Sequence, residues 1–236
     1  MEKKTLQLKT AVVIPCFQES TRILDVIKDI GPEVSQIIVI DDACPDRTGE
    51  HVKTHCADPR VQVLTHKKNT GVGGATMSGY RRAIEDGCEI IVKIDGDGQM
   101  DPSLIPILIA PLERGKADYV KGNRFYNLDG LNEMPRVRIF GNLVLSFASK
   151  ASSGYWNIFD PTNGFTAIHI DTAISLPLEK VDNGFFFESD MLFHLNMLRA
   201  VVLDIPMPAR YGDEKSSLKI HNVILSFAAR HYCNML

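Results

Sequence analysis

An apolar run that ends in two aspartates is the part of this sequence best suited to chemistry. In "IIVKIDGDGQMDP" (residues 90–102) the apolar residues predict a buried strand, and Asp95 and Asp97 follow it. Because alternate residues of an extended chain point to one side, the two carboxylates would lie roughly 6–7 Å apart. Gly96 and Gly98 remove side-chain bulk, so a large ligand could approach the backbone. A strand ending in an ordinary Asp-Gly turn is the other interpretation of these residues.

Paired carboxylates at a strand end suit a divalent cation. Mg²⁺ and Mn²⁺ prefer oxygen ligands and keep positions open for water or substrate phosphates. A second acidic strand end, Asp41-Asp42, suits the amide of a base or the hydroxyls of a ribose. Farther along, Arg124, Arg210 and Lys215 could supply cations to phosphates. These side chains fit the cleavage of a sugar–phosphate bond, with a metal ion neutralising the leaving diphosphate.

The elements that must position these residues alternate between strands and helices. Apolar runs predict strands over 10–17, 36–43, 61–66, 90–94 and 117–124, and helical spacing predicts helices over 19–30, 46–56, 72–87 and 102–115. Such alternation is typical of an α/β fold with a mostly parallel sheet and helices on both faces. Ligands bind beyond the carboxyl ends of such strands. Polar residues follow every predicted strand there: Glu19, Asp41, Asp42, Asn69, Gly71, Asp95, Asp97, Asn123 and Arg124.

The composition excludes several classes of protein. A chain of 236 residues suits one α/β domain, and its net charge of −3 gives no basic field that would recruit nucleic acid. Five cysteines without paired short spacing indicate reduced thiols of a cytosolic environment, not a disulfide framework. The sequence as given contains neither a secretory signal nor an apolar run long enough to span a membrane.

Two stretches in the C-terminal half have the pattern of amphipathic helices. Residues 137–150 place apolar side chains on one side with basic residues near the ends, and residues 217–236 repeat the pattern. A core helix is one interpretation, and a helix lying on a membrane surface is the other. The expected organisation is one domain over 1–216, followed by an amphipathic helix over 217–236 that would lead to membrane segments absent from this chain. The first stretch contains Arg138, Phe140, Val144, Phe147 and Lys150, and Arg136 comes just before it.

The glycine-rich stretch 69–80 is not a phosphate-binding loop of a known kind. It lacks the lysine of a Walker loop and the glycine spacing of the dinucleotide fingerprint. Its small residues are expected to let a helix begin close beneath a ligand.

The order of the motifs resembles family 2 glycosyltransferases with a GT-A fold, and within them the polyprenyl-phosphate glycosyltransferases related to dolichol-phosphate mannose synthase. The resemblance covers roughly residues 10–216. "VVIPCFQES" resembles VVIPxYNE, "IIVIDDACPDRTGE" resembles VVDDGSxDGT, and "DGDGQMDP" resembles the DxDxQ metal motif. "NTGVGGATMSGYRRA", "GNRF" and "FDPTNGFTAI" match further segments of that family, while "YGDEKSSLK" resembles RxxGxSK with disturbed spacing.

The resemblance implies a role for each matching residue. The nucleoside of a UDP- or GDP-linked sugar would be held by Pro15, Phe17, Glu19, Ile40 and Asp42. Asp95 and Asp97, with Gly96 between them and Gln99 assisting, would bind Mg²⁺ or Mn²⁺ and the diphosphate. Arg124, Arg210 and Lys215 would face phosphates of the donor or the acceptor, and the disturbed spacing puts Arg210 in most doubt.

The implied reaction is an inverting sugar transfer, in which an acceptor oxygen attacks the anomeric carbon. A polyprenyl phosphate at the cytoplasmic face of a membrane is already ionised near pH 7 and needs no strong base. A saccharide acceptor, as in cell-surface polysaccharide synthesis, would need one. Asp160, Glu188 and Asp190 are the candidates, although the last two could equally cap a helix.

Other functions fit the sequence less well. A sugar-phosphate nucleotidyltransferase would carry a glycine-rich loop with Arg and Lys after the first strand, where this chain has "PCFQES". A nucleotide-sugar-binding module without activity would be expected to lose the acidic pair, which is intact. Whether copies of the chain form a homo-oligomer is left open.

Overall fold

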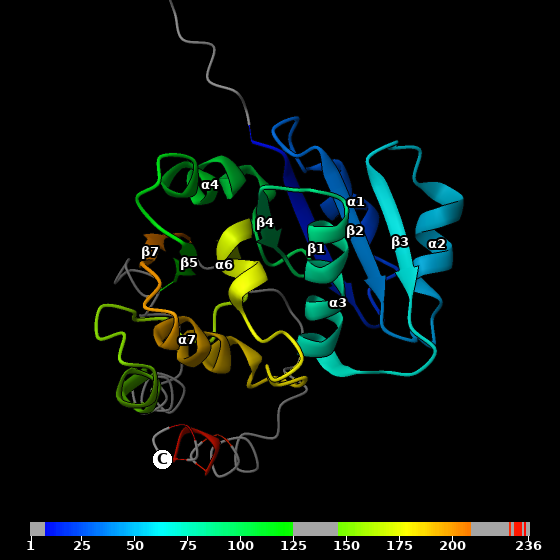
Figure 1. Cartoon of the computed structure of the whole chain (residues 1–236). Coiled ribbons are helices and arrows are strands. Elements are labelled where there is room, and N and C mark those ends of the chain that lie inside the picture. Colours follow the sequence, from blue (N-terminus) through cyan, green and yellow to red (C-terminus); the bar gives the residue numbers. More distant parts are fainter. Residues whose placement is uncertain (1–7, 125–145, 209–226, 228, 233, 235–236) are drawn as a thin grey trace, which may run out of the picture.

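A seven-stranded sheet with the order β3-β2-β1-β4-β6-β5-β7 forms the centre of the molecule (Figure 1). The computed structural model describes residues 8–124, 146–208, 227, 229–232 and 234. Within these residues the strands are β1 (Thr10–Cys16), β2 (Gln36–Asp41), β3 (Val61–Thr65), β4 (Ile90–Lys93), β5 (Tyr119–Asn123), β6 (Thr166–His169) and β7 (Val202–Pro206).

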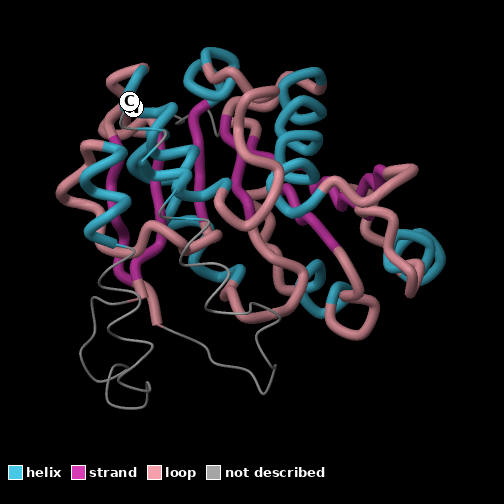
Figure 2. Tube along the Cα trace, turned by 90° about the horizontal axis from the view of Figure 1, so that it is seen from below, coloured by secondary structure: helices cyan, strands magenta, loops and turns pink. Residues whose placement is uncertain are grey.

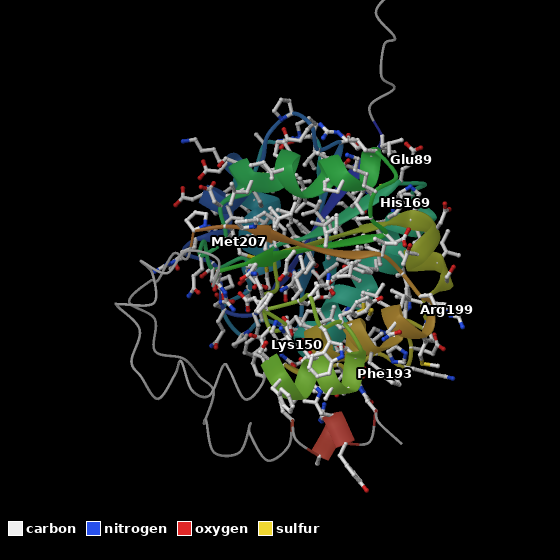
Figure 3. All side chains as sticks on the ribbon, turned by 90° about the vertical axis from the view of Figure 1, so that its left-hand side faces the viewer. Glu89, Lys150, His169, Phe193, Arg199 and Met207 are labelled. Atoms are coloured by element: carbon white, nitrogen blue, oxygen red, sulfur yellow. The ribbon has the colours of Figure 1, made fainter. Side chains whose placement is uncertain are left out.

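Helices cover both faces of this sheet (Figure 2). Apolar side chains of α1 (Ile23–Lys28) and α4 (Ile105–Glu113) pack on one face, and those of α3 (Gly71–Glu85) and α7 (Phe187–Met197) pack on the other. Figure 3 shows the sheet between α4 on one side and α7 on the other. The remaining helices are α2 (Thr48–His55), η1 (Pro102–Leu104) and α6 (Ile170–Ser175), and residues 146–153 are also helical.

The position of β1 inside the sheet explains why its sequence is apolar at successive positions. All seven of its residues are buried, because β2 and β4 flank it and helices cover both faces. Val12 and Ile14 pack into the core on one face, while Ala11 and Val13 pack into the core on the other. The predicted α/β fold is therefore confirmed.

The five predicted strands and four predicted helices are present, but two strands were missed. β6 pairs antiparallel with both β4 and β5, so it lies between these two strands. β7 pairs parallel with β5. Because β4 and β5 are each antiparallel to β6, they still end at the same edge of the sheet. The site residues that follow them therefore remain close together.

The two predicted amphipathic helices differ where the structure describes them. Phe147 is 64 % exposed, as expected for a surface helix. In the tail, Phe227 and His231 are 7 % and 2 % exposed and pack on Phe186, just before α7. These tail residues therefore pack as a core helix would. Most of both stretches, including Arg138, Phe140 and Val144, lies outside the described residues, as does Arg136 just before the first stretch. Across the described part of the chain, no helix has the length and apolarity needed to cross a bilayer.

Candidate active site

A cavity at the carboxyl ends of β4 and β5 brings together residues from distant parts of the chain. Its acidic lining comes from Asp95, Asp97, Asp101 and Glu188, and Gln99 and Arg124 also line it. The loop 162–164 and Met207 complete its wall. Five residues that the sequence singled out therefore meet here: Asp95, Asp97, Gln99, Arg124 and Glu188.

The loop that carries the two aspartates is held by hydrogen bonds from several directions. Asp97 Oδ1 accepts from the Gln99 backbone N–H at 2.9 Å, and the Asp97 carbonyl accepts from Arg22 at 3.1 Å. Gly98 has a φ of +77°, a conformation that side chains disfavour, so the turn between Asp97 and Gln99 needs a glycine. The loop thereby presents both carboxylates and the Gln99 side chain to one cavity.

The donor atoms of this cavity fit a hard divalent cation. Carboxylate and amide oxygens are the ligands that Mg²⁺ and Mn²⁺ prefer. Four carboxylates would also repel a diphosphate unless a cation lay between them. No cluster of three or more metal-ligating His, Cys, Asp or Glu side chains occurs in the portion of the chain described here. Water or ligand phosphate would therefore have to complete the coordination.

Arg124 reaches the cavity from the end of β5 and forms an ion pair with Asp160. The Arg124 Nε and Nη2 atoms donate to the two oxygens of Asp160 at 2.7 and 2.9 Å, a bidentate arrangement. The Arg124 backbone N–H donates to the same carboxylate at 3.2 Å. Asp160 is fully buried. Its role as a base stays a prediction that this geometry does not favour, because both of its oxygens already accept from Arg124.

The other two candidate bases have different surroundings. Glu188 lines the cavity, and burial raises its pKa to about 7, although Lys93 and Lys121 lower it. Asp190 accepts from the Asp182 backbone N–H at 2.9 Å and from Asn234 at 3.0 Å. Asp190 thus joins the loop before α7 to the C-terminal residues. Glu188 is the better placed of the two to act on a ligand.

The acidic end of β2 is occupied by the protein's own donors. The Asp42 carboxylate accepts from the backbone N–H groups of Thr70 and Gly71, at 2.8–3.0 Å, and lies 2.7 Å from His66 Nδ1. Asp41 accepts at 2.7 Å from the backbone N–H groups of Cys44 and Gly49. The two carboxylates therefore fix the turns that lead into α3 and α2. The nucleoside contact of Asp42 stays a prediction.

The remaining residues expected at the nucleoside lie at the ends of β1 and β2. Phe17 is 45 % exposed, as stacking on a base would require. Pro15 and Ile40 are register partners and buried, so any contact with a nucleoside would have to use their main chain. Gln18, Ala43 and Arg47 adopt left-handed conformations with φ of 67°, 57° and 56°. Among the described non-glycine residues with positive φ, the fourth is Arg199, which follows α7.

The small residues at the start of α3 make room for a protein loop. A Cβ on Gly71 or Gly73 would collide with the carbonyl oxygens of Asn183 and Asp182. Sequence reasoning expected a ligand above this helix start, but the segment before α7 lies there. Through this contact α3 fixes the loop that leads to Glu188.

Sequence reasoning missed two buried lysines next to the cavity. Lys93 and Lys121 are 1 % and 0 % exposed, and each interrupts an apolar strand. Lys121 donates to the Asn163 carbonyl, and Lys93 donates to Asp95. A lysine inside an otherwise apolar strand was the signal that could have found them, because a buried ammonium needs a partner. The predicted residues Arg210 and Lys215 lie outside the described residues.

Comparisons with known proteins identify the family of this chain. The family described as Glycosyl transferase family 2 matches residues 11–174. An undecaprenyl-phosphate mannosyltransferase from Micrococcus luteus is 30 % identical over 205 residues, 85 % of this chain and 83 % of that protein. A UDP-N-acetylglucosamine–dolichyl-phosphate N-acetylglucosaminyltransferase from Methanococcus voltae is 31 % identical over 170 residues, 66 % of this chain and 67 % of that protein.

Solved structures share the fold. Glucosyl-3-phosphoglycerate synthase from Mycobacterium tuberculosis in complex with UDP superposes with a TM-score of 0.73 at 20 % identity, covering 97 % of this chain and 80 % of that one. The same enzyme with Mn²⁺, UDP and phosphoglyceric acid gives a TM-score of 0.70 at 18 % identity, covering 97 % and 78 %. With the family match spanning most of the sheet and the acidic loop at its edge, the chain belongs to glycosyl transferase family 2 and is a glycosyltransferase with the GT-A fold.

Proposed function

We propose that the protein transfers a sugar from a UDP- or GDP-linked donor to a polyprenyl phosphate, with Mg²⁺ or Mn²⁺ as cofactor. The observation that carries the proposal is that Asp95, Asp97, Gln99 and Arg124 line one cavity. The carboxylates suit a cation and the guanidinium suits a phosphate. The similar proteins from Micrococcus luteus and Methanococcus voltae are an undecaprenyl-phosphate and a dolichyl-phosphate glycosyltransferase, which supports a polyprenyl phosphate as acceptor.

In the proposed reaction an acceptor phosphate oxygen attacks the anomeric carbon from the side opposite the diphosphate. The bond from that carbon to the diphosphate oxygen breaks, and its electrons remain on the leaving diphosphate, so the configuration inverts. Asp95, Asp97 and Gln99 would hold the cation and orient the donor, and Arg124 would bind a phosphate. The cation, when bound, supplies charge neutralisation to the leaving group. No base is required, because the acceptor oxygen is already ionised.

A donor and acceptor panel tests the proposal. Radiolabelled UDP- and GDP-sugars are incubated with undecaprenyl phosphate or with free saccharides, each with Mn²⁺, Mg²⁺ or EDTA. We expect a lipid-extractable product with one donor and only with a divalent ion. A product formed only on a saccharide would overturn the proposed acceptor.

A hydroxyl acceptor is the second candidate function, and the position of Glu188 favours it. Its carboxylate lines the cavity, and its raised pKa suits a general base near neutral pH. A base must be deprotonated, so such a reaction would speed up as the pH rises through about 7.

Glu188→Gln separates the two acceptor classes. The amide keeps the size of the side chain but cannot take a proton. With polyprenyl phosphate as acceptor we expect less than about a threefold loss of kcat, because no base is needed. A hydroxyl acceptor would instead lose roughly 10²–10⁴-fold, the usual contribution of a general base. Initial rates on both acceptors, measured at pH 6 to 9, decide between them.

We further propose that the protein docks on the cytoplasmic face of a membrane, where its acceptor would lie. The described surface carries an aromatic patch made of Phe147, Trp156, Phe159 and Lys150. Phe147 and Trp156 meet edge to face at 6.1 Å between ring centroids, and the Lys150 ammonium lies 3.6 Å from the ring centre of Phe159. Lys150 lies on the side of the sheet opposite α4 (Figure 3). Aromatic rings beside a lysine suit the interface between acyl chains and anionic headgroups.

Removing two rings of the aromatic patch should weaken membrane binding. For Trp156→Ser with Phe159→Ser we expect at least about a tenfold loss of partitioning onto vesicles containing phosphatidylglycerol, since burying one such ring is worth about 1.5–3 kcal/mol. Vesicle sedimentation measures the bound fraction. Ile107→Ser is the matched control, because Ile107 is 51 % exposed on α4, across the sheet. Equal binding by all three proteins would reject the patch as a docking surface.

A further inference from the structure

Lys93 is the last residue of β4 and one of the most deeply buried charged groups of the described structure. Its side chain is 1 % exposed. The ammonium lies 2.6 Å from Asp95 Oδ1, 4.0 Å from Glu188 Oε1, and 5.3 Å from the ring centre of Phe187. It therefore sits between the first aspartate of the acidic loop and the carboxylate at the start of α7.

The backbone around Lys93 is shaped to admit this ammonium. A Cβ on Gly164 would overlap the place that Lys93 Nζ now occupies, so a larger residue there would force the ammonium to shift. Gly164 also lines the cavity. The desolvation of a buried ammonium is costly unless carboxylates compensate it, and a methionine of similar length would pack here without that cost. Such a residue at the edge of an active site suggests a functional reason for the charge.

The contacts of Lys93 constrain how Asp95 meets a ligand. With Oδ1 bound to the ammonium, Asp95 keeps its other oxygen toward Gly164 and the cavity. A Cβ on Gly164 would lie 3.1 Å from Asp95 Oδ2 and 3.3 Å from Glu188 Oε1, so these two carboxylates converge on one region. Without a cation between them they would repel, and Asp95 could rotate away.

We propose that Lys93 is a positioning residue of the transfer reaction. Its ammonium holds the Asp95 carboxylate away from Glu188, in the orientation that serves the donor diphosphate and its cation. The inference rests on the proposed function, because it assumes that Asp95 faces that ligand. Lys93 is buried and is not among the residues that line the cavity, so it would act through Asp95.

The alternative is a purely stabilising ion pair, and the two roles predict different results. If Lys93 only stabilises the fold, its loss lowers the melting temperature and weakens the binding of every ligand. If it orients Asp95, a folded variant still binds its ligands but transfers the sugar slowly. Loss of a positive charge should leave Mn²⁺ affinity unchanged or tighter, while the reaction rate falls.

Lys93→Met tests the proposal, and Mn²⁺ binding followed by electron paramagnetic resonance gives a readout that does not depend on activity. We expect Mn²⁺ affinity equal to or tighter than in wild type, a donor KM within threefold, and a kcat at least about tenfold lower, the size expected when a positioning contact is lost. A folded variant with wild-type kcat, or with Mn²⁺ affinity and kcat reduced together, would overturn the proposal.

The double variant Lys93→Met with Glu188→Gln removes one charge of each sign and keeps the test valid if the single variant unfolds. Its kcat should stay low, because Asp95 still lacks its partner. Recovery of wild-type kcat would show that Lys93 merely neutralises Glu188, and failure of both variants to fold would assign it a structural role; either result rejects the inference. If wild type transfers no sugar from any donor of the panel, the proposed function has failed instead.

Discussion

Replacing Asp97 by asparagine should lower sugar transfer by at least about two orders of magnitude and leave the fold intact. Stabilisation of a leaving diphosphate by a bound cation is worth several kcal/mol, and each 1.4 kcal/mol or so is a factor of about ten in rate. One Asp97 oxygen already accepts from the Gln99 backbone N–H, and asparagine keeps an acceptor for that bond. Initial rates at saturating Mn²⁺, together with thermal unfolding, measure both effects.

Asp101→Asn is the matched control for Asp97→Asn. It changes a carboxylate on the same loop, but Asp101 caps η1 by accepting from Ser103, a role that asparagine also fills. We expect it to keep more than about a tenth of wild-type activity, a tenfold loss being about 1.4 kcal/mol. Normal turnover by Asp97→Asn, or full wild-type activity in excess EDTA, would contradict the assignment of Asp97 to the cation.

The sheet could be predicted wherever burial on both faces leaves a continuous apolar run. β1, β2 and β4 are of this kind, and the strands ran close to their predicted bounds. β6 and β7 follow a region whose helical pattern dominated the sequence. Nothing local to the four residues of β6 indicates that they insert between β4 and β5 in the antiparallel sense. That placement is decided by tertiary pairing.

Site residues that directly follow a strand could be predicted from the sequence. Site residues whose role depends on a partner far away in the sequence could not. Asp95 and Asp97 are recognisable because acids directly after an apolar strand are unusual. The partnership of Arg124 with Asp160 spans 36 positions and depends on the path of the loop after residue 153, so no local pattern reveals it. Asp42 was assigned to a ligand from its motif, but its contacts with Thr70 and Gly71 arise only when α3 docks beside β2.

Breaking the ion pair between Arg124 and Asp160 should cause a large loss of stability. Arg124→Met should destabilise the protein by about 2–4 kcal/mol, because it leaves the Asp160 carboxylate buried without its partner. Breaking a fully buried pair costs about 3–5 kcal/mol, and solvent reaches the Arg124 side of this one. Chemical unfolding in urea measures the change. An effect below about 0.5 kcal/mol, the size of an exposed ion pair, would contradict the bidentate geometry.

Adding Asp160→Asn to Arg124→Met separates the support that Asp160 gives from the binding that Arg124 gives. The double variant removes both buried charges, so it should regain most of the lost stability. It should not regain transfer, because the cavity still lacks Arg124, the one cationic side chain among the described residues that line it. A charged hydrogen bond to a phosphate is worth about 1.5–3 kcal/mol, so kcat/KM for the acceptor or donor should stay roughly 10–150-fold low. If the double variant instead transferred sugar normally, the role of Arg124 would be to neutralise the buried Asp160, and the phosphate would have to bind elsewhere.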